Sequence, residues 1–556
     1  MSRFRGAIPL GLIIVSILVG SGYWFNQQRQ LEPFVKQIES LKVNQSSTVE
    51  SKDYVALRRD LITLQNILNG SVFQLVSSLF FFVTAYTAWL NFIASEKKQV
   101  SERFSKAIDQ LGSNELGVRV GGIFALEQIA QTSSDEYWVV MEVLTSYIKD
   151  QSLKGKSIFN PDIKQEIQPD ESGIQAVLKQ IIAELSVSVT TDIQAALTVI
   201  SRRNSDQDPK GKVIDLSFCD IRGADLKKAK LSNADLRGTK LSGADLTEAN
   251  LSGADLQGAD LTLTVLNNAN LRKAKLNHTL LNSAYLEKAA LQDADLTNAQ
   301  LKAANLQGAK LNRSILHFAV LTNTKLQSTD FNQSKLSFAN LRDAVIDKKT
   351  NLDQKWKRIQ EINTNGAANQ PLDSFDFSEA ILTNANFEGA SLKNTNFDGA
   401  DLGGANFKNA FLNGASFKKA SVMPNLDMAN FDGAHLDKAV FKEASLQCTN
   451  FKGVGKKTSL REVTFEDVNL SSAIFQETLL EKAKFTKSIL QDTNFHLANL
   501  SEAEFNYCYS YSEKTNFQQA NLNKAVFIGS LGFANFRNSN HNEADFSKAD
   551  KTSAQF

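Results

Sequence analysis

A large apolar residue recurs at every fifth position over a long stretch of this chain, and no other feature limits its fold so strongly. From Leu216 to Ile346, 27 consecutive positions spaced by five are Leu, Ile or Phe, and the residue two before each is almost always small. A period of five fits neither an amphipathic helix nor a plain alternating strand. It fits a chain that points one small and one large side chain inward, turns and repeats, so the sequence predicts a repeat solenoid.

The number of sides follows from a second run of repeats. Beyond Phe377 the large inward residue alternates between Phe and Leu, so Phe returns every ten residues. In a four-sided coil of 20 residues, Phe397 would stack between Phe377 and Phe417, and Leu382 would stack on Leu402. A three-sided coil of 15 would place Phe over Leu, whereas like-on-like stacking keeps the width of a close-packed core constant. The pattern therefore favours four sides.

The repeats also carry a family resemblance. Segments such as Ala224 to Leu226 and Ala234 to Leu236 read A-D-L, followed by two variable residues. These residues make the chain resemble the pentapeptide-repeat proteins, and its N-terminal part resembles their membrane-attached, cyanobacterial type. The resemblance implies an all-β solenoid, a right-handed quadrilateral parallel β-helix, over residues 213–346 and 377–556. Transmembrane helices and a small α-helical region would precede it.

Two uncharged apolar segments, residues 7–25 and 71–94, lie near the N-terminus. Each is long enough to cross about 30 Å of hydrocarbon as a helix. We therefore expect a membrane hairpin over residues 1–94, with two transmembrane helices and an outside loop at residues 26–70. A buried helical hairpin and a cleaved signal peptide are the alternatives.

The flanking charges predict an orientation. Arg3 and Arg5 precede the first apolar segment, and Lys97 and Lys98 follow the second. Cytoplasmic flanks are enriched in Lys and Arg, although the expected outside loop also contains cations such as Arg29. The prediction is a multi-pass membrane protein whose repeat domain is cytoplasmic.

Helical patterns separate the second apolar segment from the repeats. Residues 95–150 have helical periodicity and should form a juxtamembrane module, and the polar residues 151–190 should form a linker and a helix. Thr191 and Gln194 match a capping box, so residues 191–212 are predicted to contain a helix. That helix would cover the open first coil of the solenoid.

The five-residue register fails once for a long stretch, over residues 347–376. Within it, Trp356, Ile359 and Ile362 indicate one amphipathic helix, followed by a loop. We interpret the stretch as an inserted element. It would either pack on the solenoid or offer a helix to a partner.

Residues able to carry chemistry are scattered. No Cys and His cluster has zinc spacing, and there is no glycine-rich phosphate loop. We therefore expect no enzyme activity and no cofactor, and we assign no catalytic, cofactor-binding or metal-ligating residue. The five isolated histidines are His278, His317, His435, His496 and His541.

The charge balance bears on partners. Lys plus Arg number 61 and Asp plus Glu number 60, giving a formal net charge of +1, so a nucleic-acid partner is not expected. The resemblance offers DNA mimicry toward type II topoisomerases as an alternative function. Lys227, Lys228 and Arg237 interrupt the acidic residues of the first coils and disfavour it.

The favoured function is a non-enzymatic, membrane-tethered scaffold whose flat faces bind other proteins. An accessory role in membrane assembly or envelope lipid export is a special case that the resemblance implies. The terminal coil, residues 517–556, shows no helical cap pattern. A homo-oligomer formed through this coil is therefore a further expectation, because an uncovered coil exposes strand edges.

Overall fold

The computed structural model describes residues 7–43, 52–154, 189–419, 425–453, 455–510, 514–530 and 532–556. Most of the expected linker at 151–190 lies outside the described residues, as does Val422, after which a register slip was expected. The contacts divide the chain into two compact units, residues 1–112 and residues 113–556.

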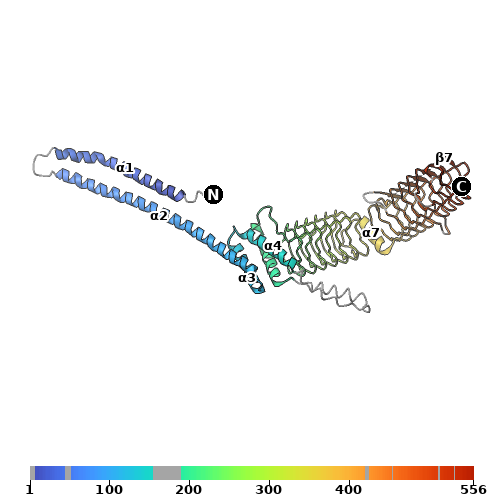
Figure 1. The fold of residues 1–556 in the computed structure, drawn as a ribbon, viewed down its shortest axis with the longest axis horizontal. Helices are drawn as coiled ribbons and strands as arrows, with labels where there is room; N and C mark the ends of the chain where they lie inside the picture. Colours follow the sequence, from blue (N-terminus) through green and yellow to red (C-terminus); the bar gives the residue numbers. More distant parts are fainter. Residues whose placement is uncertain are drawn as a thin grey trace. The chain divides into compact units, whose positions relative to one another are not determined.

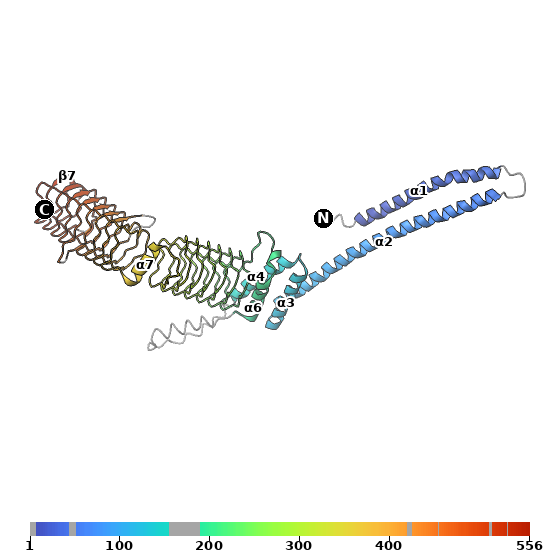
Figure 2. The same cartoon turned by 180° about the vertical axis from the view of Figure 1, so that it is seen from behind.

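The first unit is a pair of long antiparallel helices. They are α1 (Ala7–Val43) and α2 (Lys52–Leu111), and they lie side by side in both views (Figures 1 and 2). In α2, the stretch Val76–Leu111 is long and apolar enough to cross a membrane, and among the described residues it is the one helix that meets this test. Several of its large side chains are exposed, with Phe80 at 73% and Phe81 at 69%.

A leucine seam joins the two helices beyond the apolar segments. Leu31 of α1 is buried, and Leu57, Leu61 and Leu68 of α2 are half-buried at four- and seven-residue spacings typical of packed helices. The segment at residues 26–70, expected as a loop outside the membrane, is helical in its described residues, 26–43 and 52–70. The seam extends both helices past the apolar segments.

The helix α2 also continues past residue 94 without a break to Leu111. The expected juxtamembrane module is thus divided, because its first helix belongs to α2 and the rest to the second unit. The helices that open the second unit are α3 (Leu116–Thr132), α4 (Tyr137–Lys154), α6 (Thr191–Arg202) and the 3-10 turn η3 (Ser205–Gln207).

Helix α6 completes the first coil of the solenoid. The backbone N–H of Asp225 donates to Oε1 of Gln194 at 2.9 Å, and the Asp225 carbonyl accepts from Nε2 of Gln194 at 2.8 Å. The N–H of Lys230 donates to the Ser201 carbonyl at 3.1 Å. The predicted capping box between Thr191 and Gln194 is wrong. The side-chain amide of Gln194 instead bonds both backbone groups of Asp225, as a peptide group of a preceding coil would. The N-cap residue, Thr190, makes no side-chain cap bond.

The solenoid repeats every 20 residues. In the first part, parallel bridges join nearly every residue at the centre of a face to the residue 20 positions later, as in Asp215 to Asp235 and Asp235 to Asp255, and in the second part some bridges span up to 24 residues, as from Asp401 to Asn425. The four faces are numbered here in chain order. The outward residues of faces 1 to 4 are Asp215, Asp220, Asp225 and Lys230 in the first coil and Asp376, Ile381, Asn386 and Ser391 after the interruption.

Each face buries one small and one large side chain, and a tight turn leads to the next face. Ala224 and Leu226 are 0% and 1% exposed. The turn residue Lys228 is left-handed, with a φ of 57°, and the corresponding residues of most repeats share this conformation. Where the small residue is Thr, its hydroxyl donates either to a carbonyl of the preceding coil, as from Thr264 to Leu241 at 2.9 Å, or to a carbonyl three residues earlier, as from Thr478 to Phe475 at 2.7 Å. Buried hydroxyls are thereby satisfied.

The phenylalanine ladder confirms four sides. The rings of Phe377 and Phe397 stack at 5.2 Å, and those of Phe397 and Phe417 stack at 5.1 Å. A second ladder lies on face 3, where Phe387 stacks on Phe407 at 5.0 Å. Rings of the two ladders meet edge to face across the core. The structure therefore bears out the period of 20 that the alternation of Phe and Leu predicted.

Face 1 of the second part forms a continuous parallel sheet, in which each strand pairs with the next one along the chain. Register shifts fall between the strands and inside β6, between Val526 and Ile528. The strands are β1 (Ser416–Lys418), β2 (Val440–Lys442), β3 (Thr464–Glu466), β4 (Lys484–Thr486), β5 (Glu504–Asn506), β6 (Val526–Ser530) and β7 (Asp545–Asp550).

The long interruption contains the predicted helix, α7 (Gln354–Asn365), capped by the Asp353 side chain. Its apolar side chains are buried, with Ile359 0% and Ile362 1% exposed. The chain leaves the ladder of face 4 at Asn351 and re-enters that face at Pro371, one coil length later. The stretch therefore has the length of a normal coil in which a helix replaces part of the path, and α7 packs on the solenoid.

Candidate interaction surfaces

The described residues contain no group of three or more His, Cys, Asp or Glu side chains placed to hold a metal ion. The histidines lie apart: His435 stacks on Phe411 at 5.2 Å, and Nδ1 of His496 lies 3.0 Å from the Gln518 carbonyl. Burial raises the pKa of the Cys219 thiol to about 11 and that of the Cys508 thiol to about 12. Neither thiol is therefore a ready nucleophile at neutral pH.

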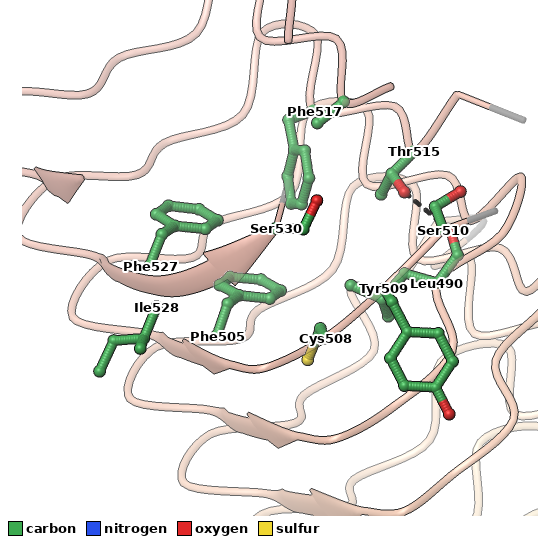
Figure 3. A pocket seen from close by; sticks show the side chains of 11 residues that line it. Leu490, Phe505, Cys508, Tyr509, Ser510, Thr515, Phe517, Phe527, Ile528 and Ser530 are labelled. Atoms are coloured by element: carbon green, nitrogen blue, oxygen red, sulfur yellow. Dashed lines mark hydrogen bonds between the residues drawn. The ribbon is translucent and has the colours of Figure 1, made fainter. Parts of the chain in front are cut away.

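A small hollow opens in the second part of the solenoid, shown in Figure 3. The rings of Phe505, Phe517 and Phe527 line it together with Cys508. Its cause is Ser510, which stands where face 2 otherwise carries a large inward residue. The space measures about 20 Å³, which is enough for one water molecule and not for an organic ligand.

A polar network ties the helices of the second unit together. Asp192 of α6 is 1% exposed and accepts from Arg119 at 2.7 Å, from Tyr147 at 2.6 Å and from Thr190 at 2.5 Å. Burial raises the pKa of Asp192, but the bonds from Thr190, Tyr147 and Arg119 outweigh it and hold the pKa at about 2. The network has a structural role, since every charge in it is paired.

A larger cavity of about 230 Å³ lies between α3, α4 and α6. Its charged lining is already paired: Arg202 binds Glu127, and Arg203 binds Asp208 at 2.8 Å. The Tyr137 hydroxyl donates to the Asn204 carbonyl at 2.6 Å. These pairs fix the junction between the helices and the solenoid, and they leave no charged side chain of the lining free for a ligand.

The solenoid surface alternates in charge. In the first part, Arg237 pairs with Asp235 at 2.6 Å and Lys275 pairs with Asp255 at 3.2 Å. In the second part, lysine and glutamate alternate from coil to coil along one corner. Such a surface lacks the continuous anionic stripe that a mimic of DNA needs.

Isolated apolar side chains interrupt the polar faces. Leu280 on face 2 is 40% exposed and Tyr285 on face 3 is 47% exposed. The faces are otherwise regular and present area rather than a cleft. The paired charge rows were not predicted from the sequence.

Comparison with known proteins identifies the repeats. The family model described as pentapeptide repeats matches in eight copies, over residues 214–247, 244–282, 279–317, 314–347, 372–409, 395–422, 425–454 and 478–509. These matches cover both parts of the solenoid and skip the interruption that contains α7. No curated protein matches the sequence.

Several solved structures are similar to parts of the chain. HetL, a pentapeptide repeat protein involved in heterocyst differentiation regulation from the cyanobacterium Nostoc sp. strain PCC 7120, is 25% identical over 52% of this chain and 86% of its own, with a TM-score of 0.13. QnrB1, a plasmid-mediated fluoroquinolone resistance protein, is 15% identical over 45% of this chain and 88% of its own, with a TM-score of 0.18. A pentapeptide repeat protein of the Arabidopsis thaliana thylakoid lumen is 27% identical over 23% of this chain and 72% of its own, with a TM-score of 0.11. TM-scores this low carry no argument, so the likeness to pentapeptide repeats rests on the residues that the family model matches.

Proposed function

We propose that this chain, whose solenoid matches the pentapeptide-repeat model in eight copies, is a non-enzymatic, membrane-tethered scaffold. The observation that carries the proposal is the pairing of a long regular solenoid with a hairpin whose apolar surface is open. Flat faces of stacked coils suit binding to other proteins, because they offer extended area with repeated side-chain positions.

The hairpin geometry supports two membrane spans. Because α1 and α2 are antiparallel, the uncharged segment 7–25 lies beside the uncharged segment 71–94. Charges bound this zone at both ends: Arg29 and Asp60 stand toward the turn, and Lys97 stands at the opposite end. Two neighbouring helices that are free of charge over about 20 residues match a bilayer core.

The orientation proposal is unchanged by the longer helices. Arg5 and Lys97 flank the open end of the hairpin, so that end and the solenoid are placed in the cytoplasm. The helical residues 29–43 and 52–60 would then lie on the other side. An accessory role in membrane assembly or envelope lipid export stays a special case of this proposed function. Membership of the membrane-attached, cyanobacterial type also stays part of the proposal. DNA mimicry is the weaker alternative because the surface charges are paired.

End-to-end association through the terminal coil is a second proposed property. Phe546 stacks on Phe527 at 4.8 Å, and Phe556, which stacks on Phe536 at 4.9 Å, is still 52% exposed. Replacement of the last ring of each ladder, by Phe546→Asp and Phe556→Asp, should then abolish self-association measured by light scattering. If the substituted chain had the same molar mass as the wild type, this proposal would be contradicted.

Affinity purification of the tagged full chain from membranes tests the scaffold itself. We expect a reproducible set of proteins that Leu280→Asp with Tyr285→Asp depletes. Lys418→Ala, a substitution of an exposed residue, serves as the matched control and should leave the set unchanged. Recovery of the same proteins with the isolated hairpin, residues 1–112, would contradict a scaffold that works through the solenoid.

A further inference from the structure

A row of alternating charges follows the corner between face 4 and face 1 in the second part of the solenoid. All six members occupy the same left-handed turn position, with φ between 54° and 61°. Their side chains therefore leave successive coils at equivalent points, about 4.8 Å apart. This row, called the corner row here, consists of Lys438, Glu462, Lys482, Glu502, Lys524 and Glu543.

The members of the corner row are exposed and only loosely paired within the chain. The ion pairs Lys438–Glu462, Lys482–Glu502 and Lys524–Glu543 measure 3.8, 3.7 and 3.6 Å. Side-chain exposure is 59% for Lys482 and 54% for Glu502. Exposed pairs this long contribute little to stability, so each head group keeps most of its capacity to bind a charge from outside.

The order of signs makes the row complementary to itself. If a second copy lies antiparallel, with the two-fold axis between Lys482 and Glu502, Lys438 faces Glu543 of the second copy and Glu462 faces its Lys524. Lys482 then faces Glu502, and all six positions meet the opposite sign. The adjacent residues of β4 and β5 follow the same rule, since Lys484 faces Glu504. A two-fold interface requires this self-complementarity.

We propose that a second copy of this chain docks antiparallel on the corner row and the adjoining sheet of face 1. The row has no net charge, so neither a nucleic acid nor an anionic membrane surface complements it. A partner must instead present alternating charges with the spacing of stacked coils, and the same row of another copy does so. The inference does not depend on membrane anchoring, because every residue it uses lies in the solenoid.

Inversion of the entire row tests the proposal. In the inverted variant each Lys becomes Glu and each Glu becomes Lys, so the alternation within the chain and its internal ion pairs are preserved. Wild-type and inverted full-length chains, carrying different tags in detergent at low salt, are captured in all combinations. We expect each form to capture itself, and capture between the two forms to fall at least about tenfold, since six contacts become repulsive.

Controls keep the outcome specific. Exchange of Lys419 and Glu443, an exposed pair at the opposite corner of face 1 with a distance of 3.4 Å, should leave capture unchanged. Capture by the corner row should also weaken with added salt and persist in Phe546→Asp, which tests the terminal coil separately. Equal capture between wild-type and inverted chains, or no self-capture of the wild type at low salt, would overturn the proposal.

Discussion

The two parts of the solenoid share one backbone path and fill it differently. In the first part, the large inward residue is Leu on nearly every face, whereas in the second part faces 1 and 3 carry Phe and faces 2 and 4 carry Leu. Leu256 and Phe397 hold the same position on face 1, and both are 0% exposed. The comparison teaches that the register of small and large residues determines this fold, and that the size of the large residue is adjusted within it.

The two parts accommodate size by different means. Phe rings of faces 1 and 3 stack along the axis and meet edge to face across it, as Phe397 and Phe407 do at 5.8 Å and 83°. Edge-to-face contact between rings is favourable and fills the width between opposite faces. A leucine core needs no such orientation. Substitutions that exchange the two kinds of residue therefore probe whether each part is fitted to its own filling.

Removal of a ring should have the largest effect. Phe397→Ala opens a cavity between Phe377 and Phe417 and should lower the free energy of unfolding by about 3–5 kcal/mol, measured by denaturant unfolding. Lys418→Ala on the surface should change it by less than about 0.5 kcal/mol. Asp398 is a poor control because its carboxylate accepts the Lys418 N–H at 2.8 Å. Equal losses for Phe397 and Lys418 would show that the inward register is wrong.

Exchange in the other direction should have a smaller effect. Leu256→Phe places a ring among leucines and should destabilise the first part by about 1–3 kcal/mol through overpacking. The conservative replacement Leu256→Met keeps the volume and should stay within about 1.5 kcal/mol. Hydrogen exchange of peptides around residue 256 localises the change. If the ring is tolerated as well as Met, the two cores do not differ in their fitted width.

Corner glycines differ in what the coil before places beside them, and Gly253 in the first part has an asparagine contact like that of Gly404 in the second. A Cβ at Gly404 would lie 2.3 Å from Oδ1 of Asn384 in the coil before, whereas a Cβ at Gly258 would meet nothing within 4 Å. Both residues have a φ of 65°, so backbone strain is the same. Gly404→Ala should therefore destabilise by about 1 kcal/mol more than Gly258→Ala. Adding Asn384→Ala should remove the excess, and an excess that persists would exclude this contact as its cause.

A falling pH should lower the folding stability of the first part of the solenoid before that of the second. The side-chain bond from Arg237 is the largest cause that lowers the pKa of Asp235, and bonds from Thr247 outweigh burial to lower the pKa of Asp245. A carboxyl with a lowered pKa stabilises the fold above its unfolded value, near 4, and this contribution is lost as the pH falls through the folded pKa. Asn406 and Asn430, at the place on face 3 that Asp245 holds in the first part, do not titrate.

Hydrogen exchange between pH 6 and pH 3, corrected for the intrinsic rate, checks this difference. Peptides within 215–260 should lose more protection than peptides within 425–453 and 455–510. Each exposed carboxylate contributes only tenths of a kcal/mol, so this is the smallest of the expected effects. If protection from exchange were lost first in the second part, the stabilising role given to Asp235 and Asp245 would be contradicted.

The sequence predicted the parts of the fold that repeat. Four sides and the Phe ladder followed from position alone, because each inward residue has the same surroundings one coil later. The helix α7 followed instead from the helical spacing of Trp356, Ile359 and Ile362. The helical structure near the tip of the hairpin was not predicted, because its seam of Leu31, Leu57 and Leu61 is short and lies among polar residues. The true partner of Gln194 was missed because Asp225 is 31 residues away and meets it only in the folded chain.

The candidate surfaces were less predictable than the fold. The charges at Lys482 and Glu502 are visible in the sequence, but their alignment depends on the extra residues between coils, which shift the spacing from 20 to 22 or 24 in places. The hollow beside Cys508 follows from Ser510 in a large-residue position.

Topology tests the claim of a membrane-tethered scaffold most directly. Cys448 is exposed on the solenoid, whereas Cys219 and Cys508 are buried, and Ser40→Cys would add a thiol near the tip of the hairpin. In intact cells, a membrane-impermeant thiol reagent should label Cys at position 40, and it should reach Cys448 only after permeabilisation. Labelling of both thiols from the same side would contradict a hairpin that crosses the membrane twice with its solenoid in the cytoplasm.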